Sequence, residues 1–432
     1  MPMRRVIALG VIFATLSAAR SEQPAELMVT YLERYHRLAE RDVESRMELA
    51  EWCADRGLLN QQADVLLEVL SLQPGHPVAY ERLIAADARR TRTVDPQWAE
   101  KLARLPGEGF HLHHSAHFTL ICETGVRDPA TTAQAMEDVY RQFYRRMRSL
   151  GLKPMPPAGR LVGVLFASHQ RYRDYLDRYE AAGDLPVSGY YSWRTNRAAF
   201  FDDRDNPAFA SVRQEIAAVD DRIAALRAEL NAGSHALSPS LMQAREQLKR
   251  LQQTRRDMAA RLEHVAAVAT LAKVRHEVAH QLCYNSGLLQ RGRQYPFWIV
   301  EGLAMLFEQP GPDDADDSQW PPVNRHRLAS YAKAQQAGRL ITVPELLAVR
   351  PGAEQNADSL SELYAQAWAL ACYLARDHPA ILAGYIESLS ASETSRDGGA
   401  HALRRLEGVE RLDDRLREAM RRLRDESAQE DR

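Results

Sequence analysis

Residues 276–280 of the chain read His-Glu-Val-Ala-His, and residues 298–304 read Trp-Ile-Val-Glu-Gly-Leu-Ala. Residues four apart on a helix lie on the same face, one turn from each other, so His276 and His280 can bind one metal ion. Glu277 lies beside them and can reach a water molecule on that metal. This is the H-E-x-x-H arrangement of zinc sites, in which the glutamate acts as general base.

A catalytic zinc ion needs a third protein ligand and keeps its fourth position open. Glu301 is the candidate, and it follows His280 by 21 positions. The histidine helix is expected to end near Gly287, and an apolar run around Leu303 predicts a second helix. A helix, a turn and a returning helix would bring Glu301 back to the metal.

These segments resemble the gluzincin metallopeptidases, the thermolysin-like clan. Residues 296–308 also fit the pattern P-x-W-x-x-E-G-L-A-x-x-F-E of a bacterial domain family of unknown function that is placed among the peptidase-MA-like gluzincins. The resemblance covers roughly Ser115 to Leu374 and implies a sheet lobe and a helical lobe around a zinc site. One position departs from it. Gluzincins carry an acidic residue four positions after the ligand glutamate, to orient a ligand histidine, and this chain has Met305 there. The orienting group is therefore expected elsewhere.

The first 19 residues predict a secretory signal peptide. Arg4 and Arg5 precede an apolar run of eleven residues, Val6 to Leu16, and a small-residue cleavage site follows at Ala19. The apolar run is too short to span a bilayer. We expect a secreted or periplasmic protein with no stable membrane insertion of the mature chain. The alternative is an uncleaved membrane anchor.

Length and charge set further limits. A chain of 432 residues is long enough for two or three domains. Its 56 basic and 58 acidic residues are balanced, so nothing suggests nucleic acid or an anionic membrane as a partner. Four cysteines allow three disulfide pairings, and buried free thiols are an equal alternative. They are Cys53, Cys122, Cys283 and Cys372.

Residues 20–105 predict helices. The stretch from Ala50 to Pro74 resembles one tetratricopeptide unit, with Gly57 at the first turn and the proline at the end. A single unit cannot bury its own apolar face, so it is expected to pack on neighbouring helices or on the catalytic domain. It is either a module that binds a protein partner or a packing lobe.

Residues 110–308 are expected to hold the sheet lobe and the metal helices. A helix is predicted at 131–150, a buried strand at 161–166, a short helix at 172–179, and strands at 187–193 and 197–201. In gluzincins an edge strand of this lobe pairs with the substrate backbone, and Gly189-Tyr190-Tyr191 stands in the comparable region. A histidine-rich stretch, residues 111–117, is either a second metal site or the entry to a strand at 117–122.

A coiled-coil hairpin is predicted as an insertion at residues 211–265. Apolar residues from Val212 to Leu230 step by three and four, and a second arm from Leu241 to Val265 does the same. The second arm has no breaker before His276, so it is expected to continue into the metal helix. The hairpin is a solvated strut, a dimer seam or a substrate gate.

Residues 309–432 predict a helical lobe, with helices at 325–337, 343–348 and 359–376 and a loop at 309–320 that rims the cleft. The chain is heavily charged from Arg404 onward, and its last residues are expected to fray. Tyr364 either packs in the core or points its hydroxyl at the metal, as the transition-state tyrosine or histidine of gluzincins does. The fold class expected is α+β and mostly helical.

The function predicted is hydrolysis of a peptide or protein substrate with Zn²⁺ on His276, His280 and Glu301, Glu277 as general base and Tyr364 as a further catalytic candidate. A secreted binding or scaffold protein with a structural or silent zinc site is the alternative. Its partner would bind the N-terminal helices or the coiled coil. Hydrolysis of a non-peptide amide, such as a cell-wall component, would use the same site.

Overall fold

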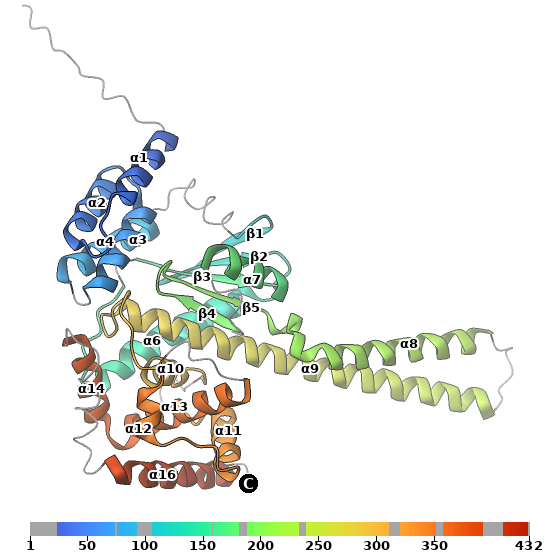
Figure 1. Ribbon diagram of the computed structural model, residues 1–432. Coiled ribbons are helices and arrows are strands. Elements are labelled where there is room, and N and C mark those ends of the chain that lie inside the picture. The colour runs from blue at the N-terminus through green and yellow to red at the C-terminus, as the bar shows by residue number, and fades with distance from the viewer. Residues whose placement is uncertain are drawn as a thin grey trace, which may run out of the picture.

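The computed structural model describes most of the chain, and Figure 1 shows how its elements are arranged. The residues described are 24–73, 76–92, 106–157, 159–180, 188–232, 239–310, 320–350, 357–391 and 409–430. Most of them are helical, and five strands form one small mixed sheet, so the predicted α+β class is confirmed. The predicted signal peptide lies outside the described residues.

The sheet has two antiparallel edges and a parallel centre. Its strands are β1 (Phe110–His114), β2 (Phe118–Glu123), β3 (Leu161–Phe166), β4 (Gly189–Ser192) and β5 (Arg197–Phe201). The order is β1-β2-β3-β5-β4, in which β2, β3 and β5 are parallel and β1 and β4 run antiparallel at the edges. The strands predicted at 161–166, 187–193 and 197–201 are confirmed. Strand β1 takes up the first part of the histidine-rich stretch and was not predicted.

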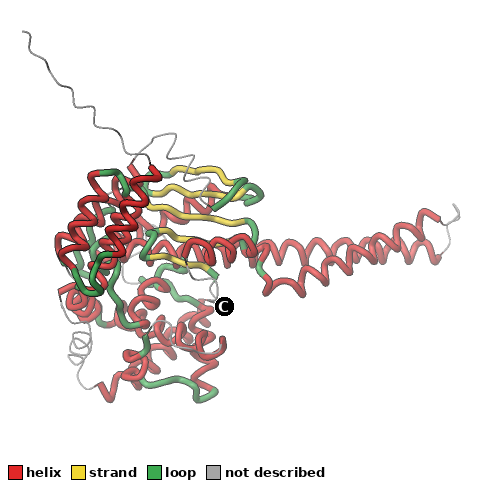
Figure 2. The backbone as a smooth tube through the Cα atoms, turned by 45° about the horizontal axis from the view of Figure 1, so that its top comes forward, coloured by secondary structure: helices red, strands yellow, loops and turns green. Residues whose placement is uncertain are grey.

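Helices cover both faces of this sheet, which explains why its central strands are apolar on both sides. Helices α6 (Pro129–Ser149) and α9 (Pro239–Asn285) share one apolar core with the sheet. Helix α7 (His169–Tyr175) and the π-helical turn Leu176–Glu180 pack on the other face. Figure 2 shows α9 running along the sheet and then out of the body of the molecule.

Helix α9 has 47 residues and joins three parts of the molecule. Its first half pairs with α8 (Ala210–Ala232) in an antiparallel hairpin that projects from the body (Figures 1 and 2). All six predicted positions of the first arm are half-buried or buried, with Ile223 only 6 % exposed, whereas their neighbours are mostly exposed. Val265, which the pattern places in the second arm of this seam, is instead 42 % exposed.

The C-terminal lobe is helical, as predicted. Its helices are α10 (Phe297–Met305), α11 (Arg325–Gln336), α12 (Val343–Ala348), α13 (Ala357–Asp377), α14 (Pro379–Ala391) and α16 (Val409–Glu430). The charged helix α16 carries a buried apolar stripe that is made of Leu412, Leu416 and Met420. Residues 431–432 lie outside the described part.

Helices α10 and α13 approach each other closely at Gly302. A side-chain Cβ there would lie 2.8 Å from the Ala367 carbonyl oxygen and 2.8 Å from the Ala371 Cβ. Only glycine fits such a contact without displacement of a backbone. The glycine next to Glu301 therefore sets the distance between the two helices that carry Glu301 and Tyr364.

The N-terminal helices form a lobe with a core of its own. They are α1 (Pro24–His36), α2 (Val43–Asp55), α3 (Leu59–Leu72) and α4 (Pro77–Arg92). Their apolar faces bury Trp52, Leu66 and Leu70 among others. The lobe also touches the loop after α9, because a Cβ at Gly292 would lie 2.9 Å from the Leu70 Cβ. It therefore packs on the rest of the chain, as expected.

Each of the four cysteines is buried and free. The choice left open by the sequence is thus settled in favour of buried thiols. None of the helices in the described ranges combines the length and the apolar character that crossing a bilayer needs.

Candidate metal centre

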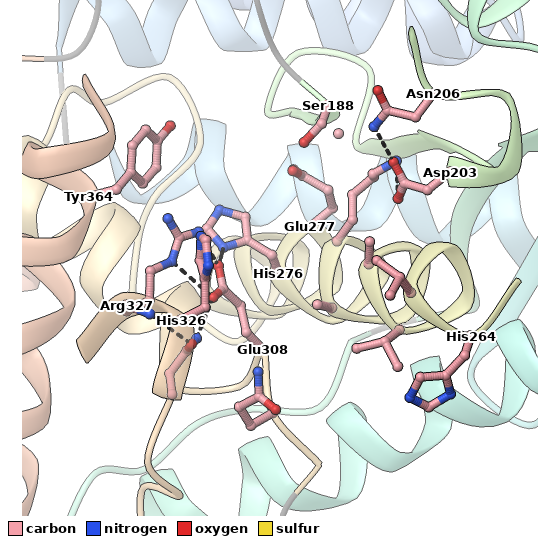
Figure 3. A pocket seen from close by; sticks show the side chains of 18 of the residues that line it. Ser188, Asp203, Asn206, His264, His276, Glu277, Glu308, His326, Arg327 and Tyr364 are labelled. Atoms are coloured by element: carbon pink, nitrogen blue, oxygen red, sulfur yellow. Dashed lines mark hydrogen bonds and ion pairs between the residues drawn. The ribbon is translucent and has the colours of Figure 1, made fainter. Parts of the chain in front are cut away.

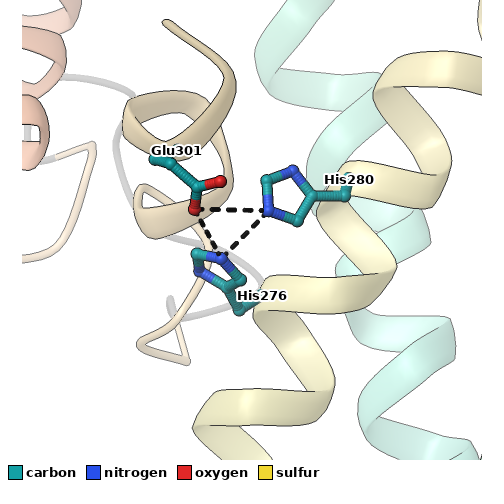
Figure 4. A group of neighbouring side chains, drawn as sticks. All are labelled: His276, His280 and Glu301. Atoms are coloured by element: carbon teal, nitrogen blue, oxygen red, sulfur yellow. Dashed lines mark hydrogen bonds and ion pairs between the residues drawn. The ribbon is translucent and has the colours of Figure 1, made fainter. Parts of the chain in front are cut away.

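Two helices bring His276, His280 and Glu301 together, as Figure 4 shows. The histidines lie on successive turns of α9, and their Nε2 atoms are 3.0 Å apart. Glu301 comes from α10, and its Oε2 lies 3.1 Å from the His276 Nε2 and 3.5 Å from the His280 Nε2. The helix–turn–helix return predicted from the sequence thus places all three side chains on one point.

The size of this triangle suits a small metal ion. A tetrahedral zinc ion with bonds of about 2.0–2.1 Å separates its ligand atoms by about 3.3–3.4 Å. The three separations of 3.0, 3.1 and 3.5 Å lie close to that value. Two imidazole nitrogens and one carboxylate oxygen are also the donor set of catalytic zinc sites. The residues present therefore fit a metal ion without rearrangement of either helix.

The electrostatics of the group favour a cation. Burial would lower the pKa of His276, but its hydrogen bonds to Glu301 and Glu308 raise it to about 10. Burial would raise the pKa of Glu301, but His280 and His276 hold it below its ordinary value. Negative charge is thus concentrated around His276, where a metal cation would replace a proton.

Glu308 orients His276, and this role was not predicted. Its Oε1 lies 3.0 Å from the His276 Nδ1. An ionised carboxylate only accepts hydrogen bonds, so the Nδ1 of His276 donates to Glu308, and the Nε2 faces the ligand group, where a metal ion would take the place of its proton. The hydrogen bonds from His276 and Arg327 overcome the effect of burial and lower the pKa of Glu308 to about 2.

Glu308 is itself held by Arg327 of α11 and by Asn324, the residue that caps the start of that helix. The Arg327 guanidinium donates to both of its oxygens, at 2.7 and 3.1 Å, and the Asn324 side-chain amide donates at 2.6 Å. Glu308 thus takes the orienting role that Met305 cannot take. It is the last letter of the pattern at residues 296–308 and lies seven positions after Glu301, just past the end of α10. That spacing was the signal available in the sequence.

Glu277 is buried, and strand β4 closes over it. A Cβ at Gly189 would lie 2.7 Å from a carboxylate oxygen of Glu277, so only glycine allows the strand this close. The backbone N–H of Tyr191 donates a hydrogen bond to the same carboxylate. Burial raises the pKa of Glu277 above its ordinary value. The carboxylate is therefore fixed beside the ligands, in a setting that makes it a better base.

Tyr364 lies across the cleft from Glu277, on α13 (Figure 3). Its ring packs edge-on against Phe297 and under the Arg327 guanidinium. The charge of Glu301 and burial raise the pKa of Tyr364 well above its ordinary value, so the hydroxyl keeps its proton. The ring thus has the packing contact of the first alternative, and the side chain also lines the cavity; a hydroxyl directed at the metal stays a prediction.

A cavity of about 710 Å³ opens between the sheet lobe and the C-terminal lobe. Ser188 and Gly189 line it at the edge strand, and His326 and Arg327 line it from α11 (Figure 3). Glu277 and His276 lie at its base, so the metal centre is reachable from solvent. Gln309, in the loop predicted to rim the cleft, lines it too; residues 311–319 of that loop are outside the described part.

A polar network fixes the far end of the metal helix. Asn196, at the β4–β5 turn, accepts a hydrogen bond from the Asn285 side chain at 2.7 Å, and its backbone oxygen accepts from Gln281 at 2.9 Å. The Asn196 amide also donates to Asp87 of α4, which pairs with the buried Arg291. The N-terminal lobe is thereby connected to the residue that follows His280.

The histidine-rich stretch has other partners. His117 lies 2.7 Å from a carboxylate oxygen of Glu137 and stacks on Tyr140, and His114 is hydrogen-bonded to Thr119. Among the described residues, the cluster of three side chains that could bind a metal ion is the one that contains His276. The second metal site considered for this stretch is therefore not formed by these side chains.

The geometry defines a class of candidate site: an H-E-x-x-H helix whose two histidines meet a glutamate from the following helix. Residues 270–394 match the model of a family described as "Protein of unknown function (DUF1570)". The match begins six residues before His276 and ends in the C-terminal lobe, so it contains all three ligand residues, Glu277, Glu308 and Tyr364. No curated protein matches the chain.

Proposed function

We propose that the protein is a zinc-dependent peptidase of the gluzincin type. One observation carries this proposal: the three ligand atoms lie 3.0 to 3.5 Å apart, with the buried carboxylate of Glu277 beside them at the base of an open cavity. A structural zinc site would be closed by a fourth protein ligand, and it would not need Glu277.

The residues around the ligand group can divide the work of amide hydrolysis. Zinc, when bound, supplies Lewis-acid polarisation and lowers the pKa of water to about 7. Glu277 takes a proton from the attacking water as the oxygen bonds to the carbonyl carbon, and passes it to the leaving nitrogen as the C–N bond breaks. The Tyr364 hydroxyl donates a hydrogen bond to the carbonyl oxygen as negative charge develops there.

Strand β4 is suited to hold the substrate backbone. It is an edge strand, and its start at Ser188 and Gly189 lines the cavity next to Glu277. Free backbone groups at a sheet edge pair with extended peptides. An extended peptide paired there would run past Glu277 and the ligand group. This supports a peptide rather than a non-peptide amide as the substrate class.

Zinc content and turnover of a peptide pool test the proposal. The protein should contain one zinc ion per chain by elemental analysis and should cleave casein or mixed peptides. Glu277→Gln should keep zinc and fold but lose at least about 10²-fold in rate, because general base catalysis contributes about 10²–10⁴-fold. Glu246→Gln on the exposed side of α9 is the matched control and should change neither. Equal cleavage by the wild type and Glu277→Gln would remove Glu277 from the mechanism.

Cleavage of nothing across a broad library would favour a binding or scaffold protein instead. The projecting hairpin and the N-terminal lobe would then carry the function. We also propose export of the protein, on the signal peptide predicted at residues 1–19. N-terminal sequencing of protein from the culture medium or periplasm should begin near Arg20, and an intact Met1 in those fractions would contradict it.

A further inference from the structure

The cavity continues beyond the metal centre, along α9 towards the hairpin. Val265, Val268, Ala269 and Ala272 line it, and their spacing puts them on one face of the helix that leads to His276. None of the four is charged. Figure 3 shows His264 at the far end of this row and Glu277 at the near end. We call these four residues the apolar groove.

Large apolar side chains are exposed in this groove. Val265 is 42 % exposed and Val268 is 50 % exposed. On a monomeric surface, neighbouring exposed apolar side chains that line a cavity mark a binding site. Neighbouring positions of the same helix are engaged with the sheet lobe, since Ala266 is buried and the Thr270 hydroxyl accepts a hydrogen bond from the Asp203 backbone N–H.

The partner helix of the hairpin stops where the groove begins. Arg255 of α9 pairs with Asp220 of α8. In an antiparallel pair, Val265, ten residues further along α9, is therefore level with Ala210, the first residue of α8. No residue of α8 is left to cover Val268 and the positions after it. The heptad pattern thus continues past its partner, into the cavity.

We propose that the apolar groove is a substrate subsite that takes the apolar side chains of an extended polypeptide on the hairpin side of the bond to be cleaved. This inference rests on the proposed peptidase function and deepens it. Eleven residues of helix between Val265 and His276 span about 17 Å. That length matches about five residues of extended chain at about 3.3 Å each.

Most of the groove lies outside the segment that matches the family model. Val265, Val268 and Ala269 precede residue 270, where the family match begins. They belong to the segment in which the inserted hairpin joins the metal helix. The insertion therefore does more than project into solvent: its base supplies part of the surface next to Glu277.

The experiment uses the zinc-loaded full chain with Glu277→Gln, so that peptides bind without being cut. A random library of labelled dodecapeptides is selected on this protein, and enriched peptides are measured by fluorescence anisotropy. We expect enrichment of Leu, Ile and Phe. The further change Val265→Gln with Val268→Gln should remove the enrichment and raise Kd about tenfold, because half-buried valine contacts are lost.

Two controls keep this result interpretable. Val265→Leu with Val268→Leu keeps the apolar surface and should bind the enriched peptides. Met242→Gln removes another exposed apolar side chain of α9, 57 % exposed and outside the cavity, and should change nothing. If the glutamine pair binds and enriches like its parent, or if no peptide binds, the groove is not a subsite.

The inference and the peptidase proposal fail in different ways. Cleavage by the wild type with unchanged selection by the glutamine pair would overturn the groove alone. Loss of binding in the glutamine pair, with no cleavage by the wild type of any enriched peptide, would support the groove and overturn the peptidase.

Discussion

Three carboxylates surround His276, and their partners give them different chemistry. Burial without a cationic hydrogen-bond donor raises the pKa of Glu277, whereas His280 and His276 lower that of Glu301. Glu308 is held ionised by His276 and Arg327. Carboxyl groups whose surroundings push their pKa values apart are suited to separate roles, which supports the proposed division into base, ligand and orienting group.

Loss of either His280 or Glu301 should empty the metal site. In His280→Ala and Glu301→Ala only two ligand atoms remain, so we expect a strong loss of zinc measured by elemental analysis after dialysis. Glu362→Gln, which breaks an ion pair with Arg339 at the edge of α13, is the control and should keep zinc. Full zinc in both alanine variants would rule out this ligand set.

Glu308→Gln should weaken metal binding without removing a ligand. The neutral amide oxygen accepts the Nδ1 proton of His276 more weakly than the carboxylate does, and weakening of such an orienting partner costs up to about 10–100-fold in affinity. Competition with a chromophoric zinc chelator measures this, and circular dichroism checks the fold. An unchanged zinc affinity would mean that the 3.0 Å contact does not orient the histidine.

Residues whose roles depend on local spacing were predictable, and those that depend on tertiary contacts were not. His276, His280 and Glu277 follow from one helical turn. Glu301 needed only a second helix, which α10 provides. The role of Glu308 depends on Arg327, and the exposure of Val265 depends on where α8 begins; neither can be derived from one segment.

At the scale of elements, the spacing of apolar residues in the sequence predicted most helices and strands. The exceptions are elements whose apolar residues stand among histidines or charges. Helix α9 runs from the hairpin into the metal helix, as expected from the absence of breakers. Strand β1 was missed because histidines obscure its alternation. No separate helix was predicted at α16 because the segment is heavily charged, although its apolar residues repeat every three or four positions.

The hairpin should be removable without loss of the metal centre. Its half-buried seam lies between its own two helices, so replacing Ser211 to Arg261 with a short linker removes a self-contained pair. Glu263, which pairs with Arg204 at the base, is kept. We expect zinc content and the circular dichroism of the remaining helices to persist. Unfolding of the sheet lobe in this variant would show that the hairpin is part of the core.

At the scale of the whole molecule, the N-terminal lobe is joined to the part of the chain around the candidate metal centre by a buried charge pair. Arg291 is 3 % exposed, pairs with Asp87 of α4, and donates to the backbone oxygens of Trp193 and Arg194. Burial lowers its pKa to about 9. The pair therefore fixes the β4–β5 turn and the lobe to each other.

Removal of Asp87 should destabilise the protein strongly. Asp87→Ala leaves Arg291 buried without its carboxylate, and breaking a buried pair in this way costs about 3–5 kcal/mol. Urea titration measures the free energy of unfolding. Glu51→Ala, which removes an exposed ion pair with Arg82 in the same lobe, should cost less than about 1 kcal/mol. Equal urea midpoints for the two variants would show that the pair of Asp87 and Arg291 adds nothing to the free energy of unfolding.

Helix α9 also connects the tip of the hairpin mechanically to the candidate metal centre. It has no break over 47 residues, so it acts as a lever about 70 Å long with the ligand histidines near one end and the hairpin tip at the other. Torque applied at the tip reaches His276 through a continuous backbone ladder. A partner that pulls on the arm must therefore either bend the helix or tilt the two imidazoles against Glu301.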